Sequence, residues 1–203
     1  MNIKKLEGVQ AISPEMNVPG SVVSVNGAVF NIFDFKLEYV NTDLIARSLA
    51  MQPRYMGHTH GFYSIAQHCV RGAEALLLCG NVLEAIQFLL HDASEAYISD
   101  IPAPLKRYLD SDGRLKELEN KIEAVIYEYY GVPFPLPDII KIVDNNLAQE
   151  EMMNLMIFPP NAQDEIFYWN PDYAYSMYKL TYNRLANIYS TLIKKSKNPN
   201  GNN

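Results

Sequence analysis

The stretch that decides the fold is LLHDASEAYISDIPAPLK, residues 89–106. An apolar run ends there in His91 and Asp92, Glu95 and Asp100 follow, and two prolines then stop the helix. Burying such polar groups costs several kcal/mol unless they are paired or bind a metal. A divalent metal is therefore the simplest explanation for an apolar run that ends in a histidine and carboxylates.

Composition indicates one domain, residues 1–195, followed by a disordered tail at 196–203. The 203 residues are 48% hydrophobic and 20% charged, and this hydrophobic content is enough to form a core.

The net charge of −6 argues against binding a nucleic-acid polymer. No apolar run has the length of a membrane span or a signal peptide, so we expect a cytoplasmic protein. Cys69 and Cys79 lack metal-type spacing, and we expect reduced thiols in or near the core.

Periodicity predicts an all-α fold with a small N-terminal β-hairpin. Residues 21–33 form the expected hairpin, in which Asn26-Gly27 suits a type I′ turn. A first helix follows Asn41 or Thr42 as its N-cap and ends at Pro53. Further helices are predicted from the apolar spacing over residues 64–80, 82–97, 115–130, 137–157 and 172–195.

Three of these predicted helices carry residues that bind metals. His68 lies on one, His91-Asp92 on the next and Asp144 on a later one. Two imidazoles and two carboxylates suit Zn, Mn, Co or Fe. Taken singly, His68 also fits a structural histidine and Asp144 a solvated or capping residue, whereas His91-Asp92 directly after an apolar run is harder to explain otherwise.

Glu95 and two polar residues after it are candidates for catalysis or substrate binding. Glu95 lies one helical turn beyond His91, so both are expected on one face of a continuous helix. A carboxylate next to a metal-bound water can accept its proton, and an exposed helix carboxylate is the alternative interpretation. Asp100 is a candidate partner of the site or a cap, and Lys106 is a candidate phosphate ligand or a surface lysine.

In this order, His68, His91-Asp92 and Asp144 resemble the HD-domain metal-dependent phosphohydrolases. The resemblance covers residues 40–155, which it marks as the core of an HD-domain helical bundle. It is strongest in HDASEAYISDIPAPLK, which is similar to bacterial 5′-deoxynucleotidases and to phage and prophage HD hydrolases. GHTHGFYSIAQHCV is similar to the segment before the first metal histidine in phage members. Some of those remove the whole triphosphate from dATP, so a phage-encoded enzyme acting in a host cytoplasm is one expectation.

The resemblance implies a role for each residue of the site. A divalent metal (Zn, Co, Mn or Mg) would be held by His68, His91, Asp92 and Asp144. Glu95 would orient or deprotonate water, Asp100 would lie beside the nucleophile or the sugar, and Lys106 would bind phosphate. Arg54-Tyr55 stands where relatives place an Arg and an aromatic that grip the nucleotide, often Arg-Trp.

Base preference is left open by that tyrosine. Tyr55 can stack on a base or be an ordinary half-buried aromatic, and Phe35 is a further candidate contact. His58 and His60 in the same loop either contact phosphate or shape the loop.

Three functions remain at this point. The first is a dATP triphosphohydrolase, favoured by the positive charge expected beyond the metal. The second is a 5′-deoxynucleotidase acting on monophosphates, and the third is a non-catalytic nucleotide sensor. The predicted helix 172–195 is rich in tyrosine and either covers the core or forms an interface. Relatives are homodimers or hexamers, so we expect a homo-oligomer.

Overall fold

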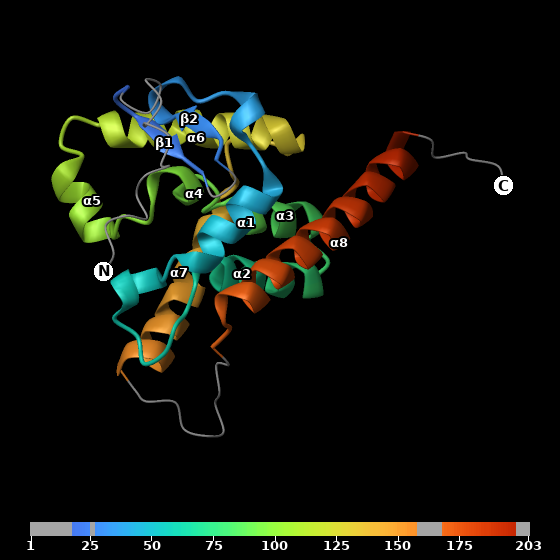
Figure 1. Ribbon diagram of the computed structural model, residues 1–203. Helices are drawn as coiled ribbons and strands as arrows, with labels where there is room; N and C mark the ends of the chain where they lie inside the picture. The colour runs from blue at the N-terminus through green and yellow to red at the C-terminus, as the bar shows by residue number, and fades with distance from the viewer. Residues whose placement is uncertain (1–17, 25–26, 158–167, 198–203) are drawn as a thin grey trace, which may run out of the picture.

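Two helices lying side by side carry the histidines and form the centre of the fold (Figure 1). The computed structural model describes residues 18–24, 27–157 and 168–197. Helix α2 (Ile65–Leu78) begins after Ser64, whose Oγ accepts the Gln67 N–H. Helix α3 (Val82–Leu90) returns alongside α2 after Gly80, whose φ of +82° suits a glycine.

The remaining elements surround this pair, and the all-α prediction is confirmed. The helices are α1 (Thr42–Met51), α4 (Glu95–Ile98), α5 (Ala103–Leu109), α6 (Arg114–Tyr130), α7 (Asp138–Met152) and α8 (Pro171–Lys197). Short helical turns are η3 (Ile32–Asp34), η4 (Leu37–Tyr39), η5 (Arg54–Gly57) and the π-type η6 (Met153–Ile157).

Gly72 allows α2 and α3 to approach closely. A Cβ at this position would lie 2.0 Å from the Phe88 ring, so only glycine leaves room for that ring. The Phe88 ring centroid lies 5.6 Å from that of His68 and 4.4 Å from that of His91. The close helix packing thus places a rigid aromatic wall beside both imidazoles.

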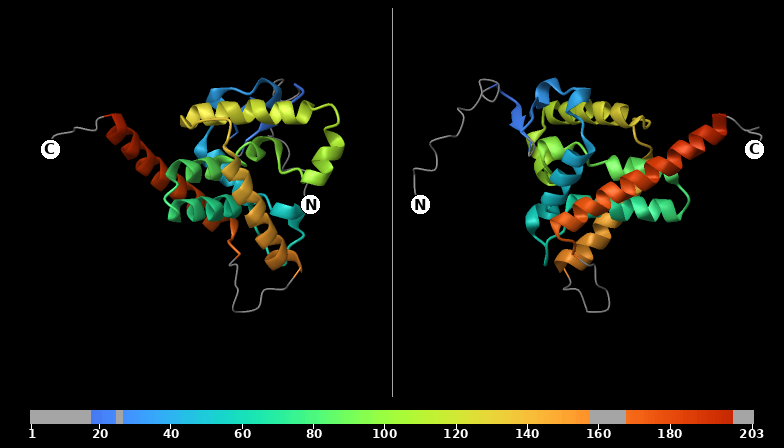
Figure 2. Two further views of the ribbon diagram at one scale, coloured as in Figure 1. Left: turned by 180° about the vertical axis from the view of Figure 1, so that it is seen from behind. Right: turned by 45° about the vertical axis from the view of Figure 1, so that its right-hand side comes forward.

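Helix α8 crosses α1, α2 and α3 and closes the core (Figures 1 and 2). Tyr178 is fully buried and its hydroxyl donates to the Leu89 carbonyl. Tyr175, Tyr182 and Tyr189 are half-buried against the core, whereas Tyr173 is exposed. The tyrosines therefore mostly cover the core, and the last turns of α8 extend away from the other helices (Figure 2).

The predicted hairpin is confirmed as a two-stranded antiparallel sheet over α1 and α4. Strand β1 (Ser21–Val23) pairs with β2 (Val29–Asn31), with Val22 opposite Phe30. Ser24 donates its N–H to the Ala28 carbonyl, and Gly27 has φ +82°. The predicted type I′ turn includes Asn26, which lies outside the described residues.

The predicted helix 82–97 is two helices, because α3 ends at Leu90 and α4 begins at Glu95. The His91 Nδ1 bonds the Phe88 carbonyl at 2.6 Å, and the Glu95 N–H bonds the Asp92 carbonyl in a tighter turn. The idea that His91 and Glu95 share one face of a continuous helix is therefore wrong.

The two prolines after this turn were predicted to end a helix, but they also begin a new one. Pro102 caps the start of α5, a helix that the sequence pattern did not predict, and Pro104 lies in its first turn. Ser99, between α4 and α5, has φ +70° and ψ 157°, a conformation rare outside glycine.

Other boundaries agree with the predictions, with one correction in burial. Asn41 caps α1 by accepting the Leu44 N–H. Cys69 is buried in the core as expected, whereas Cys79 is exposed.

The hydrophobic core extends beyond residues 40–155, because it includes Phe30 and also Ala174, Tyr178 and Leu185 of α8. Residues 198–203 of the predicted tail lie outside the described residues. Among the described helices, none combines the length and the apolar character that crossing a bilayer requires.

Candidate metal centre

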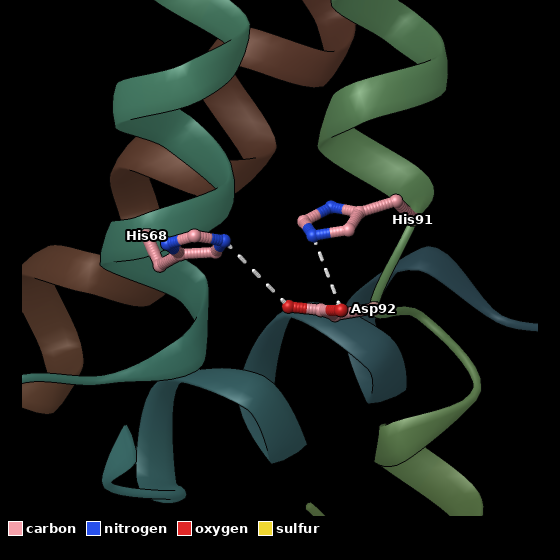
Figure 3. A group of neighbouring side chains, drawn as sticks. All are labelled: His68, His91 and Asp92. Carbon is pink, nitrogen blue, oxygen red and sulfur yellow. Dashed lines mark ion pairs between the residues drawn. The ribbon is translucent and has the colours of Figure 1, made fainter. Parts of the chain in front are cut away.

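The two predicted metal histidines face each other across the α2–α3 packing (Figure 3). His68 lies in the first turns of α2 and its side chain is fully buried. His91 directly follows α3 and is nearly as buried. Figure 3 shows both imidazoles pointing toward the carboxylate of Asp92, which stands in the turn after α3. Helix packing thus brings together residues that are 23 positions apart.

The carboxylates complete this cluster from two directions. Asp92 places one oxygen 3.2 Å from the His91 Nε2 and the other 3.9 Å from the His68 Nε2. Asp144, on α7, places its Oδ1 3.0 Å from the His68 Nε2 and 3.7 Å from the His91 Nε2. His68, His91 and Asp92 each offer a ligand atom within 4.8 Å of the others. All four predicted ligands therefore converge.

The two imidazole Nε2 atoms and the two carboxylates are better arranged to bind a cation than to hydrogen-bond to one another. Both Nε2 atoms are buried, and neither has a well-directed hydrogen-bond partner among the described residues. The His91 Nδ1 contacts the Phe88 carbonyl, which only accepts, so Nδ1 carries the proton and a neutral ring has its lone pair on Nε2. Two imidazole lone pairs and two carboxylates around one point could hold a divalent metal ion.

Without a metal, charge pairing dominates the electrostatics of the cluster. Burial lowers the pKa of His91, but the nearby carboxylates of Asp92 and Asp144 outweigh it and raise that pKa well above its ordinary value. Burial alone would raise the pKa of Asp144, but the two histidines hold it well below the ordinary range. Asp144 is thus ionised at neutral pH, as a metal ligand must be.

Glu95 and Asp100 stand beside the cluster. The Glu95 Oε2 is buried and lacks a hydrogen-bond partner in the described part of the chain. Burial, and then the charges of Asp92 and Asp100, raise the pKa of Glu95 well above its ordinary value. Burial likewise raises the pKa of Asp100, while Arg54 opposes that rise. Glu95 is therefore a carboxyl group able to exchange a proton near the cluster.

Arg54 joins the metal cluster to the loop before α2. Its guanidinium lies 3.3 Å from Asp92 and 3.1 Å from Glu151, and it is largely buried. The neighbouring Tyr55 ring lies 5.2 Å from the guanidinium carbon, and its hydroxyl donates to Glu151 at 2.7 Å. Tyr55 has φ +56° and Met56 φ +53°, so the backbone here is strained. That Tyr55 stacks on a base stays a prediction.

The other predicted substrate residues are not gathered at the cluster. Lys106, on α5, pairs with Glu119 of α6. Phe35 is half-buried against the core, with its ring edge-on to Tyr97. His58 is exposed in the loop after η5, and its backbone N–H bonds the Tyr55 carbonyl.

The sequence analysis missed Glu151, a fully buried carboxylate on α7. Its Oε1 lies 2.8 Å from the His68 Nδ1 and accepts the Tyr63 hydroxyl at 2.6 Å. Burial alone would raise the pKa of Glu151, but the hydrogen bond from His68 and nearby positive charge lower it to about 2. Glu151 follows Asp144 by seven residues and so shares its helix face, a signal that could have revealed it.

Comparison with known proteins gives one informative relative. No protein-family model matches the chain. The chain is 35% identical over 158 residues to "Uncharacterized protein YfdR" of Escherichia coli (strain K12), a match that covers 71% of this chain and 83% of that protein. The chain belongs to the YfdR family. The description of that relative names no activity or ligand, so the function of this YfdR-family member is argued from its own site.

Proposed function

We propose that this YfdR-family member is an HD-type phosphohydrolase that hydrolyses deoxynucleotides with a divalent metal. The preferred substrate is dATP, cleaved to deoxyadenosine and triphosphate. The observation that carries the proposal is the pair of buried, unpartnered Nε2 atoms of His68 and His91 facing two carboxylates. The resemblance of these residues to HD-domain phosphohydrolases supports the same function.

The chemistry divides between the metal and the residues beside it. A bound divalent cation polarises a phosphoryl oxygen and lowers the pKa of water toward neutrality. His68, His91, Asp92 and Asp144 would hold it. Glu95 takes the proton of the attacking water, because its Oε2 is buried and makes no competing hydrogen bond to the described residues. Asp100, beside Glu95, orients the water or the sugar.

Positive side chains orient the phosphate and offset its charge. Arg54 lies against Asp92 and can turn one of its N–H groups to a phosphate oxygen at the centre. Lys106, on α5, is the second cation for this role, and it has to leave Glu119 to fulfil it. Much of phosphoryl-transfer catalysis is such positioning and electrostatic stabilisation.

A 5′-deoxynucleotidase acting on monophosphates is the second candidate. It is favoured because Arg54 and Lys106, the cations that a triphosphate would need, are each paired with a carboxylate of the protein. Arg54 already faces Asp92 and Glu151, and Lys106 already faces Glu119. With these charges neutralised, less positive charge is left for a phosphate chain than the sequence suggested.

Product analysis tests the proposal and separates the two candidates. Purified protein would be incubated with Co²⁺ or Mn²⁺ and either dATP or dAMP, and products followed by chromatography and ³¹P NMR. We expect triphosphate and deoxyadenosine from dATP. Orthophosphate from dAMP with dATP untouched would establish the second candidate instead. Metal-loaded protein that binds both nucleotides and cleaves neither would be the nucleotide sensor, and would overturn both hydrolase candidates.

A further inference from the structure

Glu151 is the most completely bonded carboxylate near the metal centre, although it is not among the ligands. Its side chain is fully buried on α7. Oε1 accepts the Tyr63 hydroxyl at 2.6 Å and faces the His68 Nδ1 at 2.8 Å. Oε2 accepts the Tyr55 hydroxyl at 2.7 Å and faces the Arg54 Nε at 3.1 Å. Glu151 thus has hydrogen-bond contacts with Tyr55, Tyr63 and His68 and an ion pair with Arg54, so the fold satisfies this buried carboxylate fully.

The donors around Glu151 fix the proton on His68. Arg71 donates to the Tyr63 hydroxyl at 3.0 Å, so that hydroxyl directs its own proton to Glu151. Each neighbour thus offers Glu151 a proton or a positive charge, and the carboxylate acts only as an acceptor. The His68 Nδ1 must then donate to it, so the neutral ring that binds a metal has its lone pair on Nε2, which faces Asp144 and the metal position.

Glu151 also holds the cation that borders the metal ligands. The Arg54 guanidinium reaches Glu151 with its Nε and Asp92 with an NH group at 3.3 Å. Because the guanidinium contacts both carboxylates through different nitrogen atoms, the pairing with Glu151 holds Arg54 beside Asp92. One residue of α7 therefore orients a metal ligand of α2 and a cation of η5.

We propose that Glu151 is a positioning residue of the metal centre, which fixes His68 as an Nε2 ligand and holds Arg54 beside Asp92. The inference rests on the metal centre of the proposed function but not on hydrolysis. It assigns a function to a residue that touches neither the metal position nor the substrate. Partners of this kind behind a metal-bound histidine typically change metal affinity by about 10–100-fold.

The test measures metal binding in Glu151→Gln against Glu150→Gln. Glu150 is the matched control, because it is the neighbouring carboxylate, is exposed, and pairs with Arg71 at the surface of the described part of the chain. Titration with Co²⁺, followed by calorimetry and visible absorption, should give about 10–100-fold weaker binding and an altered spectrum for Glu151→Gln. Glu150→Gln should match the wild type. Glu151→Asp, which keeps the carboxylate, should recover part of the affinity.

Each outcome separates this inference from the proposed function. Equal Co²⁺ affinity in Glu151→Gln and Glu150→Gln overturns the role of Glu151. Wild-type protein that binds Co²⁺ tightly but hydrolyses nothing overturns the proposed function alone. Wild-type protein that binds no Co²⁺ overturns both.

A measurement on wild-type protein keeps the inference testable if Glu151→Gln does not fold. In ¹⁵N-histidine-labelled protein loaded with Zn²⁺, we expect the His68 Nδ1 to carry a slowly exchanging proton. Zinc bound at the Nδ1, or a freely exchanging proton there, contradicts the proposal.

Discussion

The metal-binding half and the substrate-binding half of the candidate site differ in how their side chains are held. His68, His91 and Asp144 come from three packed helices, and the two imidazole Nε2 atoms are buried without hydrogen-bond partners among the described residues. Arg54 and Lys106, by contrast, come from a short turn and a short helix, and each is already paired with a carboxylate. The first half is ready for a ligand, whereas the second has to exchange partners.

This difference separates two kinds of specificity. Rigid helix packing, with Phe88 against both imidazoles, sets where a cation could bind. In the proposed hydrolase, the paired cations would set how much positive charge a phosphate chain meets, because each has to leave a protein carboxylate first. Metal binding should therefore respond strongly to single substitutions and substrate affinity only modestly.

The largest effect is expected from His91→Ala. Removing a ligand should weaken Co²⁺ binding by more than about 100-fold, beyond the effect of a residue behind a ligand, and bring dATP hydrolysis to background. His58→Ala is the matched control for metal content, since His58 is exposed in the loop after η5 and is not a candidate metal ligand. Metal content by mass spectrometry and product release would be measured for both. Full metal content in His91→Ala would break the comparison.

Glu95→Gln should leave the metal in place and still lose catalysis. Losing a proton acceptor typically costs about 10²–10⁴-fold in rate. Because Glu95 is not a predicted ligand, Co²⁺ affinity should stay close to that of the wild type. Steady-state kinetics alongside calorimetry would show whether rate and binding separate in this way. A variant that hydrolysed dATP at the normal rate would exclude Glu95 as the base.

Low pH should reduce the stability that Glu151 contributes through its contacts with His68 and Arg54. Burial would raise the pKa of Glu151, but the hydrogen bond from His68 and the nearby positive charge outweigh burial and lower that pKa from 4.5 to about 2. A lowered pKa contributes stability above pH 4.5 that is lost as the pH falls toward 2, here about 3 kcal/mol. Urea unfolding in EDTA should show the advantage of wild type over Glu151→Gln shrinking by about this much from pH 6 to pH 2. A pH-independent difference would contradict the assignment.

The smallest effect is expected from releasing Lys106. Glu119→Gln removes the carboxylate that holds the Lys106 ammonium, so the cation is free for phosphate. Partly exposed ion pairs are worth about 0.2–1 kcal/mol, so KM for dATP should fall by at most about fivefold. Lys106→Ala should raise KM instead. Kinetics with dATP and dAMP would show whether the change in KM is larger for the longer phosphate chain. KM values equal to that of the wild type in both variants would exclude Lys106 from substrate binding.

The sequence predicted the helices that have regular apolar spacing, and with them the convergence of the four candidate metal ligands. Residues within strongly periodic helices, such as His68 and Asp144, could be assigned because helix packing dictates their direction. The break after Leu90 was missed, because it depends on the His91 side chain bonding the Phe88 carbonyl. Helix α5 was missed because prolines open it rather than only ending its predecessor.

Other contacts between residues far apart in the sequence could not be predicted. The partners of Arg54, Lys106 and Phe35 are tertiary contacts, and local sequence carries little sign of them. Glu151 was overlooked because an acidic pair near a helix end is usually solvated, although its spacing from Asp144 places both on one face.

The central claim is a metal centre between α2, α3 and α7. The most direct measurement is an anomalous difference map from crystals of the wild-type protein grown with Mn²⁺ or Co²⁺. The account predicts one strong peak about 2.0–2.2 Å from the Nε2 atoms of His68 and His91, and in contact with Asp92 and Asp144. A map with no peak there, or with its only strong peak elsewhere on the protein, would contradict the account.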